Sequence, residues 1–407
     1  MNDIDHRVLG NKLDLFHQQE EGAGMVFWHP RGWTLYRVLE DYVRARMRRA
    51  GFREIRTPQL LARSLWEKSG HWEKFGGAMY SLADAEEGRA LCLKPMSCPC
   101  HVQVFNQRVR SYRELPVRYS EFGACHRDEP SGALEGLKRT RAFVQDDAHV
   151  FCAAAHIEAE VGHFCALLRE VYADLGFPEF KVVLATRPAS RAGSEQTWDR
   201  AEEALANAAR AAGLEFDVLE GEGAFYGPKL EFHLTDSRAH SWQCGTIQLD
   251  FVLPERLDAE FVNERNERER PVMIHHAVLG SMERFIAMLL EHDEGWLPVW
   301  LAPEQVAVAT ISDASLGYAE EAFRALEDVG VRAVLDGRPE RLEKKIVDAR
   351  GMRVPVLVVG SRDERDRTMS VRWRDGRREV FAVGEGVECL RGDGGGAFEG
   401  EVDGRCR

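Results

Sequence analysis

Three absences limit the classes of protein to which this 407-residue sequence can belong. It has no apolar run near the roughly 18 residues that a membrane-spanning helix needs. Its first ten residues, MNDIDHRVLG, lack the apolar core of a secretory signal. Its nine cysteines are scattered and odd in number, which argues against a disulfide framework. We therefore predict a cytoplasmic protein that makes no contact with membranes.

Positive charge is also in short supply. The formal net charge is −13, with 30% charged and 44% hydrophobic residues. Those fractions are ordinary for folded globular proteins, so most of the chain is predicted to fold. The net charge excludes a uniformly basic surface, and any contact with nucleic acid must use a local basic patch. At roughly 150 residues per domain, the length suggests about two or three domains.

The first three quarters of the chain mix helices with strands. Residues 31–50 have the apolar spacing of one helix, and residues 52–57 alternate like a strand. Residues 117–122 and 141–151 flank a polar loop, as in an antiparallel hairpin. Further helices are predicted over residues 156–175, 197–212 and 279–291. Because helices and strands do not alternate regularly, we predict an α+β domain with an antiparallel sheet.

The pattern changes near residues 294–298. Beyond them, short apolar strands alternate with helices, which is typical of parallel βαβ units. We therefore predict that residues 1–297 form the α+β domain and residues 298–384 a smaller α/β domain. Residues 385–407 are rich in glycine and acidic side chains and are predicted to be a disordered tail.

Two groups of arginines are candidates for binding an anion. Arg127 and Arg139 belong to the predicted hairpin, and arginine offers planar, bidentate donors to phosphate. Phe143, in the same hairpin, could stack under a purine. Arg284 lies in the first turns of a helix that Gly280 and Ser281 open, so a helix N-terminus and a guanidinium could face one anion. The residues alone leave an alternative, a solvated hairpin with surface ion pairs.

These same residues resemble the signature motifs of class II aminoacyl-tRNA synthetases. Arg127-Asp128-Glu129 with Phe143 resembles motif 2, and residues 280–285 resemble motif 3. Residues 31–58 resemble motif 1, the dimer element. The similarity runs from about residue 5 to about residue 383. Further stretches resemble the threonine-specific members of the class: residues 24–30, 65–72, 93–99, 145–149, 223–229, 242–250 and 271–275.

The resemblance implies one zinc ion per chain, held by Cys98, His149 and His275. Spacing alone does not predict this site, because the three residues lie far apart in the sequence. Three protein ligands leave an open position, as in catalytic zinc sites. Threonine could occupy that position through its amino and hydroxyl groups, whereas valine lacks the hydroxyl. A site that binds a hydroxyl rejects such an analogue far better than an apolar pocket does.

The resemblance also implies roles around ATP. Arg127 is expected to bridge the substrate carboxylate and the α-phosphate, while Arg139 and Arg284 hold the γ-phosphate. Phe143 is expected to stack on adenine, and Mg²⁺ to bridge the phosphates. The remaining ATP-site residues implied by the resemblance are Glu129, Gln243, Thr246 and Gln248.

At the amino-acid end, Asp147 is expected to accept the threonine hydroxyl. His71 matches a histidine near the transfer step, with an ordinary packed histidine as the alternative. The other substrate contacts implied by the resemblance are Met96, Gln145, Tyr226, Lys229 and Ser281.

The sequence departs from the family pattern at several positions. Glu135 stands where the motif 2 loop usually has His, and Cys100 stands where Gly usually follows Cys98-Pro99. His276 replaces the Arg that usually follows the third zinc ligand. In the smaller domain, Pro339 and Glu343 replace an Asn-like residue and a Gly, which could alter anticodon reading. No editing domain is expected before residue 1.

The function implied is ATP-dependent activation of threonine and its transfer to the 3′ end of tRNA(Thr), by a homodimer formed through residues 31–58. One alternative is a paralogue that activates threonine, or a related hydroxy amino acid, for a carrier protein or an unusual tRNA. A second is a non-catalytic RNA-binding protein, which the intact arginines and zinc ligands disfavour. Net charge requires a local basic surface for tRNA. The smaller domain offers Arg338, Arg341, Lys344, Lys345, Arg350, Arg353, Arg372, Arg374, Arg377 and Arg378.

Overall fold

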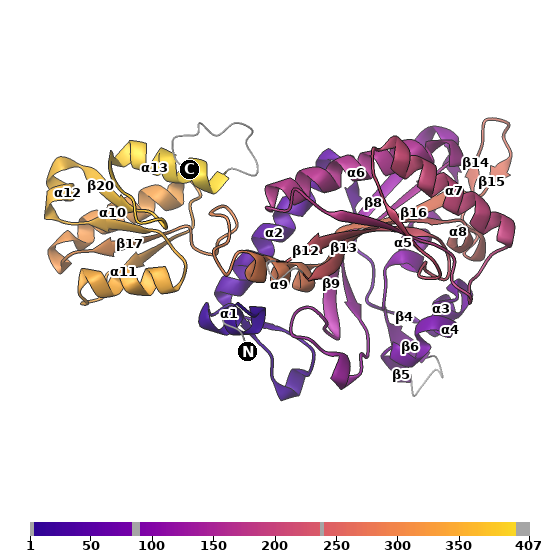
Figure 1. Ribbon diagram of the computed structural model, residues 1–407, viewed down its shortest axis with the longest axis horizontal. Helices are drawn as coiled ribbons and strands as arrows, with labels where there is room; N and C mark the ends of the chain where they lie inside the picture. The colour runs from indigo at the N-terminus through magenta and orange to yellow at the C-terminus, as the bar shows by residue number, and fades with distance from the viewer. Residues whose placement is uncertain (1–3, 84–89, 237–239, 396–407) are drawn as a thin grey trace. The chain divides into compact units, whose positions relative to one another are not determined.

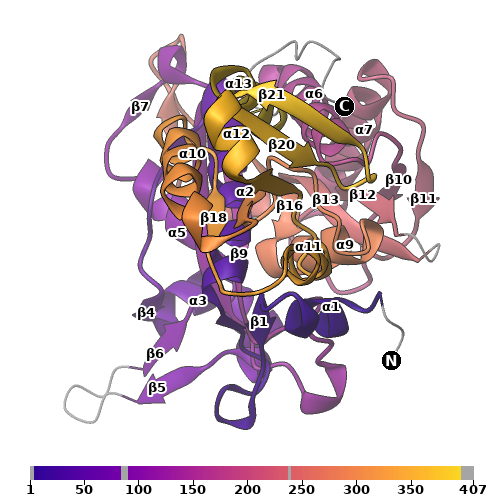
Figure 2. The ribbon, with the colours of Figure 1, turned by 90° about the vertical axis from the view of Figure 1, so that its left-hand side faces the viewer.

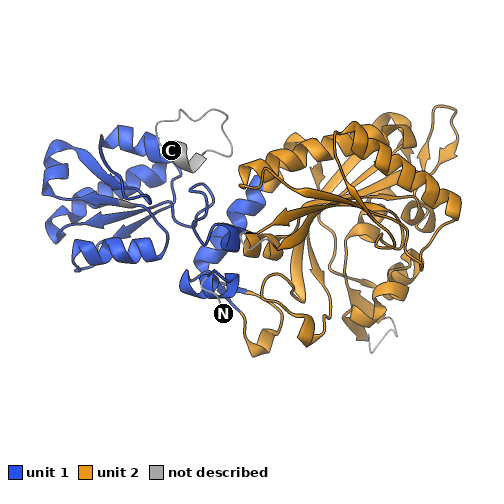
Figure 3. Ribbon diagram, viewed as in Figure 1, with its two compact units in different colours: residues 1–17, 27–42, 289–407 blue, residues 18–26, 43–288 orange. Residues whose placement is uncertain are grey.

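The computed structural model describes residues 4–83, 90–236 and 240–395 (Figure 1). The chain divides into two compact units, shown in different colours in Figure 3. Unit 1 contains residues 1–17, 27–42 and 289–407, and unit 2 contains residues 18–26 and 43–288. This division differs from the predicted boundary at residue 297. The reason is that the N-terminal segments pack with the residues after 289.

Two contacts inside unit 1 illustrate that packing. His6 Nδ1 lies 2.8 Å from Glu291 Oε1, and both side chains are buried. Arg31 forms an ion pair of 2.7 Å with Glu304. Residues from the two ends of the chain therefore share one folded unit, which a reading of local composition could not reveal.

Unit 2 is built on an eight-stranded sheet in the order β11-β10-β12-β13-β16-β9-β8-β3. Most neighbouring pairs are antiparallel; β10–β11 and β3–β8 are the parallel ones. The predicted antiparallel α+β domain is thereby confirmed. The strands are β3 (Arg53–Glu54), β8 (Val117–His126), β9 (Ala142–Cys152), β10 (Lys181–Ala185), β11 (Asp217–Leu219), β12 (Lys229–Thr235), β13 (Ser241–Asp250) and β16 (Val272–Ser281).

Helices α6 (Ile157–Asp174) and α7 (Glu195–Ala211) lie along one side of this sheet (Figure 1). The Tyr172 hydroxyl of α6 donates to Val278 O at 2.9 Å and accepts from Gly245 N at 2.8 Å. A Cβ at Gly245 would lie 2.7 Å from that hydroxyl, so the close approach of helix and sheet requires glycine there. Among the described residues, none of the helices combines the length and the apolar character that crossing a membrane demands.

The other helices of unit 2 are short: α3 (Arg63–Ser69), α4 (His71–Phe75), α5 (Cys98–Phe105) and α8 (Val252–Arg256). Two of them begin at a predicted site residue, α4 at His71 and α5 at Cys98. Two longer helices have residues that are assigned to both units: α2 (Pro30–Arg49) and α9 (Met282–His292). The predicted helices 31–50 and 279–291 correspond to these two. The predicted strand 52–57 is much shorter in the structure, where only β3 pairs with β8.

Unit 1 contains α1 (His6–Lys12) and a five-stranded sheet in the order β18-β17-β19-β20-β21 (Figure 2). β17 is parallel to both β18 and β19, as the βαβ pattern predicted, and β20 and β21 continue the sheet antiparallel. The strands are β17 (Val306–Thr310), β18 (Ala333–Asp336), β19 (Val356–Val359), β20 (Thr368–Arg372) and β21 (Arg378–Ala382). The helices are α10 (Leu316–Asp328), α11 (Leu342–Gly351), α12 (Ser361–Asp366) and α13 (Val383–Gly395).

The tail prediction is wrong for its first part, because α13 continues to residue 395. Val387 and Leu390 of this helix are buried, 6% and 3% exposed, in the core of the small domain. Together with Val383 they follow the i, i+4, i+7 spacing of one helix face, a signal that the glycine-rich composition masked. Residues 396–407 lie outside the described residues.

Candidate active site

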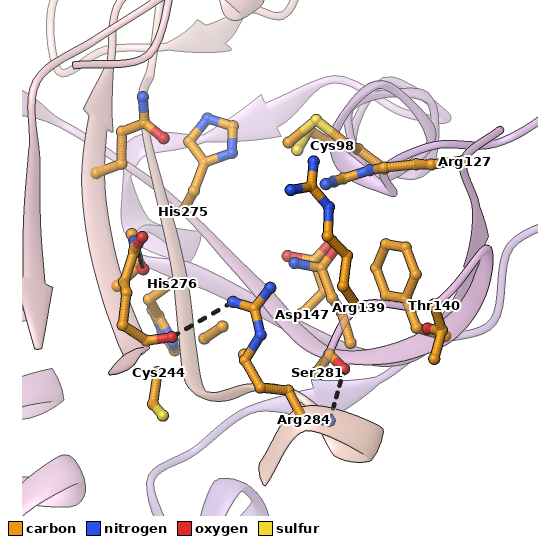
Figure 4. A pocket seen from close by; sticks show the side chains of 18 of the residues that line it. Cys98, Arg127, Arg139, Thr140, Asp147, Cys244, His275, His276, Ser281 and Arg284 are labelled. Carbon is orange, nitrogen blue, oxygen red and sulfur yellow. Dashed lines mark hydrogen bonds between the residues drawn. The ribbon is translucent and has the colours of Figure 1, made fainter. Parts of the chain in front are cut away.

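A cavity of about 340 Å³ opens in unit 2 above β9, β13, β16 and the start of α9 (Figure 4). Its walls contain all but three of the residues that the sequence predicted for the site. They are Met96, Cys98, Arg127, Glu129, Arg139, Phe143, Gln145, Asp147, Tyr226, Gln243, Thr246, Gln248, His275, Ser281 and Arg284. The tertiary structure thus gathers segments separated by almost 190 residues around one space.

Arg127, Arg139 and Arg284 extend into this cavity from different elements (Figure 4). The Arg127 guanidinium lies 5.0 Å from the centre of the Phe143 ring, and its Nε donates to Pro95 O at 3.2 Å. Arg139 forms an ion pair of 2.8 Å with Glu129. Arg284 donates to Lys138 O at 3.0 Å.

The three guanidinium groups give the part of the cavity around them a positive charge that suits an anion. Burial lowers the pKa of Arg284, and the positive charges of Arg127 and Arg139 lower it further. A polyanion placed among them would relieve that repulsion, because each cation would gain an opposite charge. Arginine clamps of this kind suit phosphate in particular.

Asp146 fixes the backbone just before α9, the helix that carries Arg284. Its carboxylate accepts hydrogen bonds from the backbone N–H groups of Val278, Leu279 and Gly280, at 2.7, 2.8 and 2.8 Å. Burial raises the pKa of Asp146 to about 7, although the three amides favour its charged form. Gly280 has a φ of +86°, and a Cβ there would meet Cys244 O at 2.8 Å, so only glycine suits this bend. The sequence assigned Asp146 no role.

Cys98, His149 and His275 form a cluster that could hold a metal ion, and Cys98 and His275 line the cavity. Their ligand atoms all lie within 4.8 Å of one another, and all three side chains are buried. His149 Nε2 lies 2.9 Å from His275 Nδ1. The two histidines are direct partners in the register of β9 and β16, and Cys98 comes from the first residue of α5.

The donor set fits zinc in particular. One thiolate and two imidazole nitrogens match the ligands of catalytic zinc sites, which keep an open position. Asp147 faces the same space (Figure 4), and its Oδ2 is buried with no hydrogen-bond partner among the described residues. An unsatisfied buried acceptor is costly unless a ligand supplies the missing donor. The part of the cavity around Asp147 is therefore suited to a polar ligand that donates a hydrogen bond.

Three predicted residues do not line the cavity: His71, Lys229 and His149. Lys229 forms an ion pair of 2.7 Å with Glu231 on the same strand. His149 is fully buried, and its Nε2 lies 2.9 Å from Nδ1 of His275, which does line the cavity.

His71 is fully buried, with its ring 5.5 Å from Phe225 and 6.1 Å from Tyr226. Burial and nearby positive charge lower the pKa of His71 to about 3, so the ring is neutral at pH 7. His71 Nδ1 lies 2.9 Å from Ser69 Oγ, whereas its Nε2 is buried with no hydrogen-bond partner in the described part of the chain, so its role near the transfer step stays a prediction.

The structure also adds residues that the sequence did not single out, namely Lys138, Thr140 and Cys244. The Lys138 ammonium lies 4.0 Å from the Trp242 ring, and Lys138 directly precedes Arg139. Among the departures, His276 lines the cavity, and its ring packs 4.9 Å from Phe52. The only sequence signal for Lys138, Thr140 and Cys244 was their position next to predicted residues.

Comparison with known proteins identifies the class that this fold and cavity define. Residues 80–293 match the tRNA synthetase class II core domain (G, H, P, S and T), and residues 305–391 match an anticodon binding domain. The chain belongs to the class II aminoacyl-tRNA synthetases. This agrees with the family that the motifs around Arg127 and Arg284 had indicated.

Within that class, its curated relatives are threonine–tRNA ligases. The enzyme of Caulobacter vibrioides is 55% identical over 391 residues, which are 96% of this chain and 60% of the relative. The enzyme of Gluconacetobacter diazotrophicus is 53% identical over 388 residues, again 60% of its length. The chain therefore spans about 60% of the length of these relatives.

A solved structure supports the same placement. The RNA binding domain of threonyl-tRNA synthetase from Cryptosporidium parvum superposes with a TM-score of 0.90 at 39% identity. The match covers 96% of this chain and 98% of that one. Prolyl-tRNA synthetase of Giardia lamblia shares the fold at a TM-score of 0.74 with 18% identity.

We predict that Arg284→Ala weakens ATP binding about 10- to 100-fold, because it removes one of three cations that face the anion site. Isothermal titration calorimetry with Mg²⁺–ATP measures the effect. Arg210→Ala is the matched control, since Arg210 is an exposed arginine of α7 that contacts Asn207 outside the cavity. Equal affinity for Mg²⁺–ATP in the Arg284 and Arg210 variants would contradict the assignment of Arg284 to phosphate binding.

Proposed function

We propose that this chain activates threonine with ATP and transfers it to the 3′ end of tRNA(Thr). One observation carries the proposal: a single cavity is lined by three arginines and by Cys98 and His275, two members of the cluster that could hold a metal ion. A molecule that spans it would place its anionic part among the arginines and its polar, amino-acid part at the cluster. The identity with threonine–tRNA ligases supports the same assignment.

The first step requires positioning more than covalent chemistry. The threonine carboxylate attacks the α-phosphorus of ATP, and pyrophosphate leaves with the electrons of the broken bond. Arg127 would orient the carboxylate and the α-phosphate, while Arg139 and Arg284 would stabilise the departing charge. Mg²⁺ would bridge the phosphates. Phe143, in the cavity wall beside Arg127, would stack on adenine.

Cys98, His149 and His275 would hold zinc, which offers a position to the amino and hydroxyl groups of the amino acid. The unpartnered Oδ2 of Asp147 would accept the threonine hydroxyl. Valine would leave that acceptor unsatisfied, and a buried polar group left without its partner discriminates strongly against the wrong substrate.

Two further parts of the proposal concern assembly and location. We propose a cytoplasmic homodimer that forms through residues 31–58. Trp33, at the start of α2, supports this role, because 48% of its surface is exposed and it stacks on Tyr36 at 4.9 Å. Aromatic residues are enriched in protein interfaces relative to the rest of the surface.

A second candidate is a paralogue that passes the activated amino acid to another acceptor. Glu135 favours it, because it puts an anion in the loop that faces the tRNA end in this class. The test is threonine-dependent exchange of pyrophosphate into ATP, followed by charging of bulk tRNA. Exchange with charging supports the proposal, and exchange without charging supports the paralogue. Absence of both activities, in protein that binds ATP, would favour a non-catalytic RNA-binding role.

We predict one zinc ion per chain and its loss in Cys98→Ser, because a hydroxyl is a poor ligand for zinc. Metal analysis of the purified, unchelated protein measures the content. Cys100→Gly is the control: Cys100 is also buried on α5 but lies outside the ligand cluster, and burial raises the pKa of its thiol to about 11. Active wild-type protein without zinc, or loss of zinc in Cys100→Gly, would contradict the assignment.

The cationic side chains that the sequence offers for tRNA binding differ in burial and in ion pairing. Lys345 is 2% exposed and donates to Thr310 O at 3.0 Å, so it is part of the core. Arg338 pairs with Asp336, and Lys344 lies next to Asp348. Three of the arginines form no ion pair with any described residue and line one cavity together with Trp296 and Trp373. They are Arg350, Arg372 and Arg378.

We predict that Arg378→Ala weakens tRNA binding and lowers the slope of log affinity against log salt by about one, since one phosphate contact is lost. Binding is measured by fluorescence anisotropy at several salt concentrations. Arg324→Ala is the control, because Arg324 is an exposed arginine of α10 that is already paired with Glu320. Identical salt slopes for the two variants would remove this surface from the tRNA-binding site.

A further inference from the structure

A buried chain of hydrogen bonds continues from the metal-ligand cluster into the protein. His149 Nδ1, on the side of the ring away from His275, lies 2.8 Å from His101 Nδ1. His101 Nε2 lies 3.1 Å from Glu121 Oε2. Both histidines are 0% exposed and Glu121 is 3% exposed, so no solvent reaches this chain.

We propose that His101 is a positioning residue that orients His149 toward the metal and connects it to the carboxylate of Glu121. The inference rests on the metal site of the proposed function. Metal-bound histidines almost always donate their second N–H to an outer partner, which fixes the ring and its tautomer. No ligand role for His101 itself is needed, because both of its ring nitrogens already face partners inside the protein.

Only one arrangement of protons satisfies the whole chain with a metal bound. His149 Nε2 faces the cluster and must offer a lone pair, so the N–H of His149 is on Nδ1 and donates to His101. His101 Nδ1 is then an acceptor, and the N–H of His101 is on Nε2 and donates to Glu121. Each imidazole therefore uses one donor and one acceptor, and the direction of the chain runs from the metal to the carboxylate.

Glu121 is well suited to end this chain. Its carboxylate accepts from Thr57 N at 2.8 Å, from Thr57 Oγ1 at 2.9 Å and from Lys94 Nζ at 3.1 Å. Lys94 is itself fully buried. Although burial opposes it, the hydrogen bonds from His101 and from Thr57 N, together with the charge of Lys94, hold the pKa of Glu121 well below its ordinary value. Glu121 is thus a fixed anion that can only accept hydrogen bonds.

The fold explains why an intermediate histidine is required. In the register of β8 and β9, Glu121 is the partner of Asp147, whereas His149 is the partner of Tyr119. The carboxylate is therefore two positions away from His149 along the sheet. His101 bridges this gap from α5, and it lies three residues after Cys98, on the same face of that helix.

The second histidine ligand has a shorter connection. His275 Nε2 lies 2.9 Å from Asp250 Oδ2, so its carboxylate partner is direct. Asp250 Oδ1 in turn accepts from the backbone N–H groups of Val252 and Leu253, at 2.7 and 2.9 Å. Both imidazole ligands thus end on an anchored carboxylate, one directly and one through His101.

The test compares zinc affinity in three full-length proteins by competition with a chromogenic chelator. His101→Phe keeps a ring but removes both hydrogen bonds, and we expect a 10- to 100-fold loss of zinc affinity. His101→Asn places a carbonyl oxygen near the position of Nδ1, so it should recover part of that loss. The visible absorption of the Co²⁺-substituted proteins should change in His101→Phe and return toward wild type in His101→Asn.

His156→Phe is the matched control, since His156 is a half-buried histidine before α6 with no contact to the cluster. Wild-type affinity and an unchanged cobalt spectrum in His101→Phe would overturn the positioning role while leaving the metal site intact. Equal losses in His101→Asn and His101→Phe, at equal melting temperature, would also overturn it. If wild-type protein binds no zinc, the metal site of the proposed function fails instead.

Discussion

Strand β9 pairs with β16 along one edge and with β8 along the other, and its register decides which side chains meet in the site. It places His149 beside His275 and Gln145 beside Ser281. On its other edge it places Asp147 beside Glu121. A slip of one residue would turn every one of these side chains to the opposite face of the sheet. The metal-ligand cluster and the carboxylate behind it are therefore consequences of a single pairing.

The cavity combines two kinds of chemistry. Three guanidinium groups line it, in a protein whose net charge is −13, so the positive potential is local and directed. It also contains a thiol, an imidazole and the unsatisfied Asp147, which suit a metal ion and a small polar ligand. Enzymes of the class II synthetases, the class to which this chain belongs, join the carboxylate of an amino acid to the α-phosphate of ATP and release pyrophosphate, so the two kinds of chemistry match the two substrates of the class.

The departures from the family pattern do not all have the same weight. Cys100 is buried in an apolar cluster with Trp66, Met79 and Cys92 and is not among the residues that could hold a metal ion. His276 packs against Phe52 and Phe164, which gives it a structural environment in place of an arginine's charge. Glu135 remains the departure with a direct bearing on the acceptor, because it lies in the loop between β8 and β9.

The sequence by itself determined the elements and the motifs. Apolar spacing predicted α2 and α6, the β8–β9 hairpin and the βαβ order of the small domain, because these depend on local periodicity. The tertiary structure alone decided that His71 lies among aromatic rings and that Lys345 belongs to the core. It also decided that His101 lies behind His149. Such contacts join residues far apart in the chain, and they are set by strand register and helix packing, which no local pattern encodes.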